Sequence, residues 1–230
     1  MIATISTLVM AMAQPLAAAP PGAGSHLDVA AVVAKVQKRY DEASDFKARF
    51  AQTLTSTALK RTTNSSGQVT FKKPGRMRWD YEKPDKSSYI TDGGVLWLYE
   101  PDDKQAFKQD LKASQLPSAL AFLLGKGKLA TEFDITFGPE RGSVPMGGAT
   151  VKNYVLSLSP KTPQAQVKSI LFVVDPRDWF VHQSEITDAQ GNTNVILFSD
   201  VVMNSKVPET LFHFTPPAGT RVIDTGKLGK

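Results

Sequence analysis

The chain has 230 residues, of which 41% are hydrophobic, and it carries 27 Lys and Arg against 22 Asp and Glu for a net charge of +5. This length and composition fit one sheet-rich domain, and the charges are interspersed with no basic block among aromatic residues, which argues against a nucleic-acid site. The absence of cysteine excludes disulfide bonds, thiolate metal sites, cysteine nucleophiles and a lipid anchor on cysteine.

Residues 1–24 are expected to form a signal peptide followed by a linker. Residues 2–13 are apolar but too few to span a bilayer, and the alanines at 17–19 form a small-residue cleavage pattern. No Lys or Arg precedes Lys35, so the usual basic start is missing and a disordered apolar leader is the alternative. We expect export to the periplasm, removal of the signal peptide and one folded domain over residues 25–230.

A helical period begins in the next segment. Ser25 followed by Asp28 resembles a capping box. From Val29 to Ala43 apolar residues recur at spacings of three and four, with charged residues between them. The pattern predicts one amphipathic helix over about 27–44.

From Phe46 the hydrophobic period changes to two, which predicts a strand with one apolar face, continuing through Phe50 to Leu54. Turns rich in Gly, Pro and Asp separate the strands that follow. These strands are predicted near residues 66–73, 76–82, 87–91, 95–99 and 105–109. Because short turns cannot join parallel neighbours, the strands are expected to form an antiparallel meander.

The period breaks again between residues 112 and 128. Ser114 is a candidate cap with Pro117 in the first helical turn, and Gly125 is a stop signal. The segment between them is apolar almost all round, so a short helix here must be covered on most sides.

Strands are expected to resume after this helix and bring the total to eleven. A Gly- and Pro-rich stretch at 138–149 is expected to be a mobile loop, and a last short apolar run covers 211–214. The strands of this second group are predicted near residues 131–138, 150–158, 167–175, 180–188 and 192–203.

The chain lacks the common signatures of catalysis and cofactor binding. It has no glycine-rich phosphate loop and no Gly-x-Ser-x-Gly elbow. His26, His182 and His213 are interpreted as surface or loop residues without a second histidine or a carboxylate at metal-ligand spacing. We therefore expect no enzyme activity, no metal and no cofactor, although a site assembled across distant strands would be invisible in the sequence.

The strand at 76–82 is the most distinctive one. Met77, Trp79 and Tyr81 share one face, which suits either an ordinary core or the wall of a cavity that accepts acyl chains. With this strand, the sequence resembles the outer-membrane lipoprotein carrier (LolA) family over nearly the whole mature chain. The matching pieces are Phe50 to Gln52, Pro74 to Trp79, Pro84, Asp92-Gly93, Leu96 to Pro101 and Phe212 to Gly219.

The resemblance implies an unclosed antiparallel β-barrel of about eleven strands with a lid of short helices over its concave apolar side. Carriers of this family take acylated lipoproteins from an inner-membrane ATP-driven releasing complex and pass them to an outer-membrane lipoprotein receptor, without hydrolysis. A periplasmic monomer without cofactor is therefore expected.

The resemblance also implies roles for individual residues. Lys73 falls at a lid latch where the family often has an arginine, so the latch is expected to be looser here. The expected cavity wall consists of Phe50, Met77, Trp79, Tyr81, Tyr89, Leu96 and Leu98, although both faces of strand 95–99 are apolar and the choice between them stays open. The expected lid consists of Val36, Tyr40, Pro117, Leu120, Ala121, Phe122, Leu123 and Leu124.

Two other classes of function remain as alternatives at this point. A lipid-sensing regulatory domain of related fold would need a second domain or a membrane anchor. A small lipid hydrolase would be revealed by turnover of an ester substrate.

Overall fold

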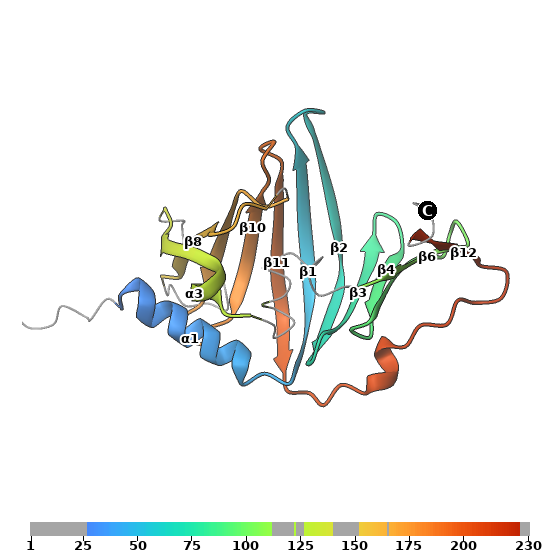
Figure 1. The fold of residues 1–230 in the computed structure, drawn as a ribbon, viewed down its shortest axis with the longest axis horizontal. Coiled ribbons are helices and arrows are strands. Elements are labelled where there is room, and N and C mark those ends of the chain that lie inside the picture. The colour runs from blue at the N-terminus through green and yellow to red at the C-terminus, as the bar shows by residue number, and fades with distance from the viewer. Residues whose placement is uncertain (1–26, 112–121, 123–126, 140–151, 165, 226–230) are drawn as a thin grey trace, which may run out of the picture.

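The computed structural model describes residues 27–111, 122, 127–139, 152–164 and 166–225. They form one large unclosed sheet with few helices (Figure 1). The helix that precedes the sheet is α1, Val29–Asp41. Its first turn is capped by Asp28, whose carboxylate accepts a hydrogen bond of 2.7 Å from the backbone N–H of Ala31. The cap is therefore Asp28 rather than Ser25, and the helix is shorter than predicted.

The first half of the sheet is the expected antiparallel meander. β2 begins five residues earlier than predicted because its first residues, polar on both faces, continue the pairing with β1. The strands are β1 Asp45–Ser56, β2 Arg61–Lys72, β3 Arg76–Lys83, β4 Ser87–Thr91, β5 Val95–Glu100 and β6 Gln105–Asp110.

The second half of the sheet joins the first through β11, which pairs antiparallel with β1. A short helix, α3 (Leu129–Glu132), leads into it. The remaining strands of the meander are β7 Phe133–Phe137, β8 Tyr154–Pro160, β9 Ser169–Val174, β10 Val181–Thr187 and β11 Thr193–Met203. The eleven predicted strands are thus confirmed.

A twelfth strand and a short turn follow in the C-terminal segment. β12, Arg221–Asp224, runs parallel to β6 and forms one edge of the sheet. The apolar run predicted at 211–214 overlaps a 3-10 turn, η2 (Glu209–Phe212), instead of forming a strand. Four residues are too few for a period-two pattern to stand out, so β12 escaped prediction.

The two faces of the sheet are covered by different parts of the chain. On the face we call the inner face, α1 buries Val32, Val36 and Tyr40 in a core shared with β1–β3 and β7–β11. On the outer face, the segment after β11 crosses β3–β6, where the carbonyl of Leu211 accepts a hydrogen bond from Arg78. Among the described residues, no helix is both long and apolar enough to cross a membrane.

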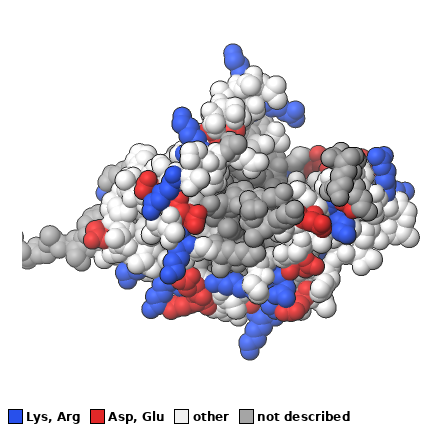
Figure 2. All heavy atoms as spheres, viewed as in Figure 1, with Lys and Arg blue, Asp and Glu red and all other residues white. Residues whose placement is uncertain are grey.

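Charged side chains are spread over the surface. In the space-filling view, basic and acidic residues alternate over the visible face without forming one large block of either sign (Figure 2). This agrees with the interspersed charges of the sequence.

Candidate functional site

The inner face carries a layer of aromatic rings at the centre of the sheet. The ring of Phe50 lies 4.9 Å from that of Trp79 and 5.0 Å from that of Tyr81, centroid to centroid. Gly67 on β2 is paired with Phe50 on β1 and with Tyr81 on β3, and because it has no side chain it leaves room for the Phe50 ring. Phe50, Met77 and Trp79 are 3%, 7% and 9% exposed, so this part of the expected wall lies within the protein core.

An open groove continues the inner face over β4, β5 and β6. Cross-strand pairing places Tyr89 opposite Leu98, and Leu98 opposite Phe107, so these side chains share one face. The groove has a volume of about 380 Å³. We call it the open groove; its lining consists of Tyr89, Leu96, Leu98, Glu100, Phe107, Gln109 and Thr225.

The structure thereby identifies which face of β5 lines a cavity. Leu96 and Leu98 face the open groove. Trp97 and Tyr99 lie on the outer face, where their rings are 5.4 and 5.1 Å from that of Phe214 in the C-terminal segment. Phe107 was not predicted as a site residue, and its position became evident only from its pairing with Leu98.

A second, polar cavity of about 470 Å³ adjoins the groove at the end of the strands. We call it the rim pocket; its lining consists of Thr63, Ser65, Tyr81, Pro84, Asp85, Lys86, Ser87, Tyr89, Glu100, Asp102 and Asp103. Tyr89 and Glu100 line both cavities.

Hydrogen bonds order the wall of the rim pocket. The hydroxyl of Tyr81 donates to Gln52 Oε1 at 2.8 Å, and Gln52 Nε2 donates to Asn194 Oδ1 at 2.9 Å. Burial raises the pKa of Tyr81 to about 12. Burial, assisted by the nearby Glu100, also raises the pKa of Tyr89. Both phenols are therefore neutral hydrogen-bonding groups at physiological pH.

Among the expected lid residues that the structure describes, Tyr40 and Phe122 lie next to each other. The ring of Tyr40 lies 4.6 Å from that of Phe122 and 5.5 Å from that of Phe180, and the Tyr40 hydroxyl accepts a hydrogen bond from the N–H of Val181. Phe122 is 3% exposed, and burial raises the pKa of Tyr40. Val36 is buried in the same core. The other expected lid residues, Pro117, Leu120, Ala121, Leu123 and Leu124, lie outside the described residues.

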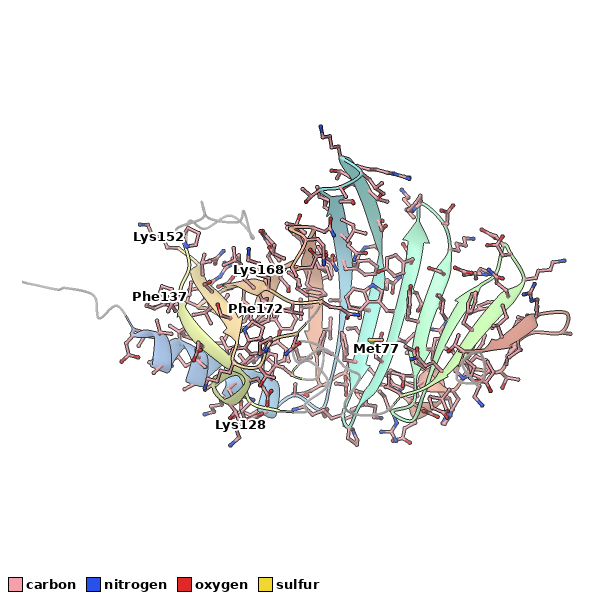
Figure 3. All side chains as sticks on the ribbon, turned by 45° about the horizontal axis from the view of Figure 1, so that its top comes forward. Met77, Lys128, Phe137, Lys152, Lys168 and Phe172 are labelled. Carbon is pink, nitrogen blue, oxygen red and sulfur yellow. The ribbon has the colours of Figure 1, made fainter. Side chains whose placement is uncertain are left out.

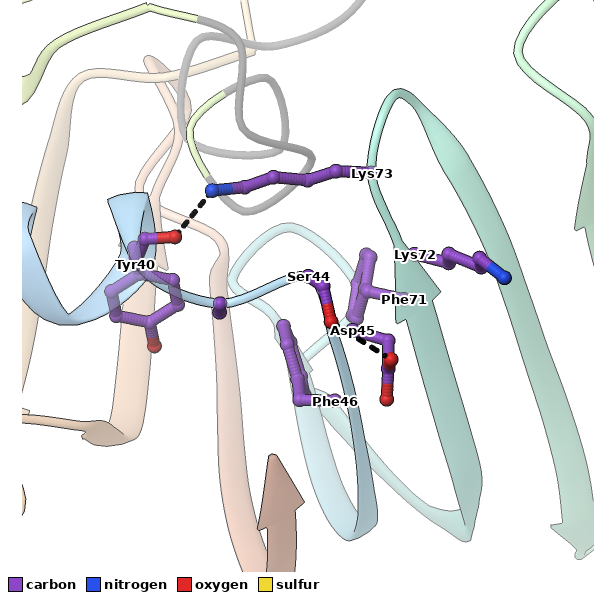
Figure 4. A pocket seen from close by; sticks show the side chains of 8 residues that line it. Tyr40, Ser44, Asp45, Phe46, Phe71, Lys72 and Lys73 are labelled. Atoms are coloured by element: carbon purple, nitrogen blue, oxygen red, sulfur yellow. Dashed lines mark hydrogen bonds between the residues drawn. The ribbon is translucent and has the colours of Figure 1, made fainter. Parts of the chain in front are cut away.

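Lys73 reaches the C-terminal end of α1 from the turn between β2 and β3 (Figure 4). Its Nζ donates hydrogen bonds to the backbone carbonyl of Tyr40 and, at 3.1 Å, to that of Asp41. Burial lowers the pKa of Lys73, and the Asp41 carboxylate opposes this effect. The side chain thus joins the turn between β2 and β3 to the C-terminal end of α1.

One expectation about histidine is wrong. His182 Nε2 lies 2.9 Å from Asp178 Oδ2, and Asp175 completes a cluster whose ligand atoms all lie within 4.8 Å of one another. The spacing of four residues arises across the turn before β10, not on a helix. The carboxylate of Asp175 also accepts hydrogen bonds from the Arg177 guanidinium, which neutralises part of the cluster's charge.

Comparison with a family model and with individual known proteins points to the same protein family. Residues 41–215 match the sequence model of the family described as outer membrane lipoprotein carrier protein LolA. The outer-membrane lipoprotein carrier protein of Nitrosospira multiformis is 31% identical over 183 residues, which cover 80% of this chain and 84% of that protein. The protein of the same name from Pseudomonas paraeruginosa is 30% identical over 226 residues, covering 97% and 98%.

The fold also has a counterpart among solved structures. An uncharacterized conserved protein from Thermus thermophilus superposes with a TM-score of 0.55 at 10% sequence identity, covering 85% of this chain and 98% of that one. At this level of identity the likeness concerns the fold alone.

Proposed function

Because the chain belongs to the family of outer membrane lipoprotein carrier protein LolA, we propose that it binds the acyl chains of lipoproteins on its inner face and carries them across the periplasm. The open groove is the observation that carries this proposal. Its volume of about 380 Å³ falls in the range of about 300–1,000 Å³ that is usual for small-ligand sites. Tyr89, Leu96, Leu98 and Phe107 supply a mostly apolar lining.

The strength of acyl-chain binding sets a limit on how the carrier works. Burial of one CH₂ stabilises a complex by about 0.8 kcal/mol, so one sixteen-carbon chain could contribute roughly 12 kcal/mol. Three fully buried chains would contribute roughly 36 kcal/mol, which exceeds the limit of about 18–21 kcal/mol for non-covalent binding. A carrier that bound so tightly could not unload. We therefore expect incomplete burial and an energetic cost of opening the lid, which favours release.

The buried aromatic layer next to the groove provides a place where opening could create more binding surface. α1 and Phe122 meet at Tyr40, and Lys73 holds the adjacent end of α1. We propose that this helix and the segment 117–124 act as the lid and that Lys73 is its latch. Displacement of the lid would extend the open groove across Trp79 and Met77, which belong to the same core cluster.

The proposal extends to partners and processing. The chain is expected to receive lipoproteins from an inner-membrane ATP-driven releasing complex and to deliver them to an outer-membrane receptor as a monomer, without a chemical reaction. Residues 1–24 are proposed to be removed as a signal peptide and linker, leaving residues 25–230 as the carrier domain.

The test is capture of a triacylated lipoprotein released from inner-membrane vesicles in the presence of ATP. Leu98→Asp places a charge in the open groove, whereas Ala51→Asp places the same charge on an exposed site of the outer face of β1. Since an unpaired charge is disfavoured against acyl chains, Leu98→Asp should reduce capture about tenfold or more, and Ala51→Asp should not.

Thermal unfolding of both variants checks that each is folded. Capture by folded Leu98→Asp at the wild-type level would contradict binding in the groove. Hydrolysis of the cargo's ester bonds by the purified protein would contradict a carrier without enzyme activity.

A further inference from the structure

The rim pocket is acidic although the chain as a whole is basic. Four carboxylates, from Asp85, Glu100, Asp102 and Asp103, line it together with one ammonium, from Lys86. The carboxylate of Glu100 is held in place by a hydrogen bond of 2.6 Å from Gln105 Nε2. The net charge of the chain is +5, so this negative lining is a local feature of the pocket.

The rim pocket lies where the polar end of an acylated ligand would emerge from the open groove. Leu96, Leu98 and Glu100 alternate along the inner face of β5, and Glu100 lines both cavities. The four residue-to-residue steps from Leu96 to Glu100 span roughly 13 Å along the strand. An acyl chain that lies along these leucines with its polar end toward Glu100 places that end within reach of the rim pocket.

The lining of the rim pocket suits a peptide chain. The hydroxyl groups of Thr63, Ser65 and Ser87 line the pocket beside the carboxylates, and the Tyr81 hydroxyl, which donates to Gln52, can still accept a hydrogen bond. Hydroxyl groups can donate to and accept from backbone amides of any sequence. The carboxylates, by contrast, attract cationic residues and repel acidic ones, and such a field discriminates between ligands that share the same apolar anchor.

We propose that the rim pocket receives the first polypeptide residues after the acylated residue of a bound lipoprotein, and that it favours basic over acidic residues there. This inference rests on the proposed acyl-chain binding. It adds a specificity-determining element to the carrier, formed by the turns that follow β3 and β5.

The experiment compares two synthetic peptides with the same tripalmitoyl-Cys-Ser anchor, one followed by four Lys and the other by four Glu. Binding is measured by displacement of a fluorescent fatty acid from the full-length wild-type protein. We expect the Lys peptide to bind roughly tenfold more tightly at low salt. The difference should shrink in about 1 M salt, where the Debye length falls to about 3 Å.

Matched variants locate the effect. Asp102→Asn/Asp103→Asn removes two charges from the rim pocket and should bring the affinities of the two peptides together. Asp134→Asn/Asp200→Asn removes two charges at exposed positions outside the rim pocket and should keep the preference for the Lys peptide. Thermal unfolding verifies that both double variants are folded.

The outcomes separate this inference from the proposed function. If the fluorescent fatty acid does not bind the wild-type protein, or if neither peptide displaces it, binding of the lipoprotein's acyl chains is refuted. If both peptides bind the wild-type protein equally, or the preference persists in folded Asp102→Asn/Asp103→Asn, acyl-chain binding stands and charge selection by the rim pocket is overturned.

Discussion

Removing the ammonium group of Lys73 measures how firmly the C-terminal end of α1 is held on the sheet. Lys73 Nζ donates to the carbonyls of Tyr40 and Asp41, at a helix end where carbonyls lack intrahelical partners and a cation is favourable. Hydrogen bonds from a charged donor contribute about 1.5–3 kcal/mol. Because the side chain is only partly buried, solvent screening places Lys73→Ala at the lower end, about 1.5 kcal/mol. Opening of α1 should therefore increase about tenfold.

Amide hydrogen exchange over residues 29–41 reports this opening directly. Lys72→Ala is the matched control, because Lys72 Nζ donates to the carbonyl of Val207 at 2.6 Å in the C-terminal segment instead of α1. We expect Lys73→Ala to accelerate exchange in α1, and Lys72→Ala to accelerate exchange near residue 207 only. Lys73→Arg, with five donors in a fixed geometry, should exchange no faster than the wild-type protein.

Two results would refute this reasoning. Exchange in α1 that is the same in Lys73→Ala and in the wild-type protein would show that the contact contributes nothing to holding the helix. Equal acceleration of α1 by Lys72→Ala would show that the effect is general destabilisation.

Three further predictions concern stability and capture. Burial tends to raise the pKa of Asp45, but hydrogen bonds from Ser205 and Ser44 leave it below its ordinary value. The ionised carboxylate therefore stabilises the fold above pH ~4, and this stabilisation is lost in more acidic solution. Asp45→Asn should lower the free energy of unfolding in urea by about 1–3 kcal/mol at pH 7 and by much less at pH 3. An equal cost at both pH values would contradict this. Gly67→Ala should destabilise by about 3 kcal/mol or more in the same assay, because its Cβ would lie 1.9 Å from the Asp80 carbonyl oxygen. Wild-type stability would show that the backbone relaxes at this point, where the register of β2 with β3 shifts between Ser66 and Gly67. The combined substitutions Leu120→Ser, Phe122→Ser, Leu123→Ser and Leu124→Ser should abolish lipoprotein capture in a protein whose circular dichroism spectrum still shows the β-sheet. Unchanged capture would refute the proposal that this segment is the lid.

Much of the sheet was predictable because strand alternation is a local property. The pattern from Phe46 to Phe50 predicted which side chains of β1 share a face, and the same reasoning grouped Met77 with Trp79. Figure 3 shows the Met77 side chain among the side chains of the sheet. The burial of these residues in one core cluster with residues of α1 was not predictable, since it depends on contacts between segments far apart in the chain.

Parts of the candidate site had no readable signal in the sequence. The rim pocket joins two turns with two residues of β2, Thr63 and Ser65, and only strand pairing brings them together. The contact of Lys73 with α1 was expected through family resemblance alone, because nothing in its neighbours indicates a distant carbonyl. The four-residue spacing of Asp178 and His182 is present in the sequence, but their contact depends on the turn that precedes β10.

By itself, the sequence determined one amphipathic helix and eleven antiparallel strands, because periodicity and turn chemistry act over a few residues. Only the tertiary structure decided which apolar face of β5 is open. Leu96 and Leu98 line the groove because Trp97 and Tyr99 are covered by Phe214 from the far end of the chain. Both faces are equally apolar in the sequence, so the choice depended on what packs against each of them.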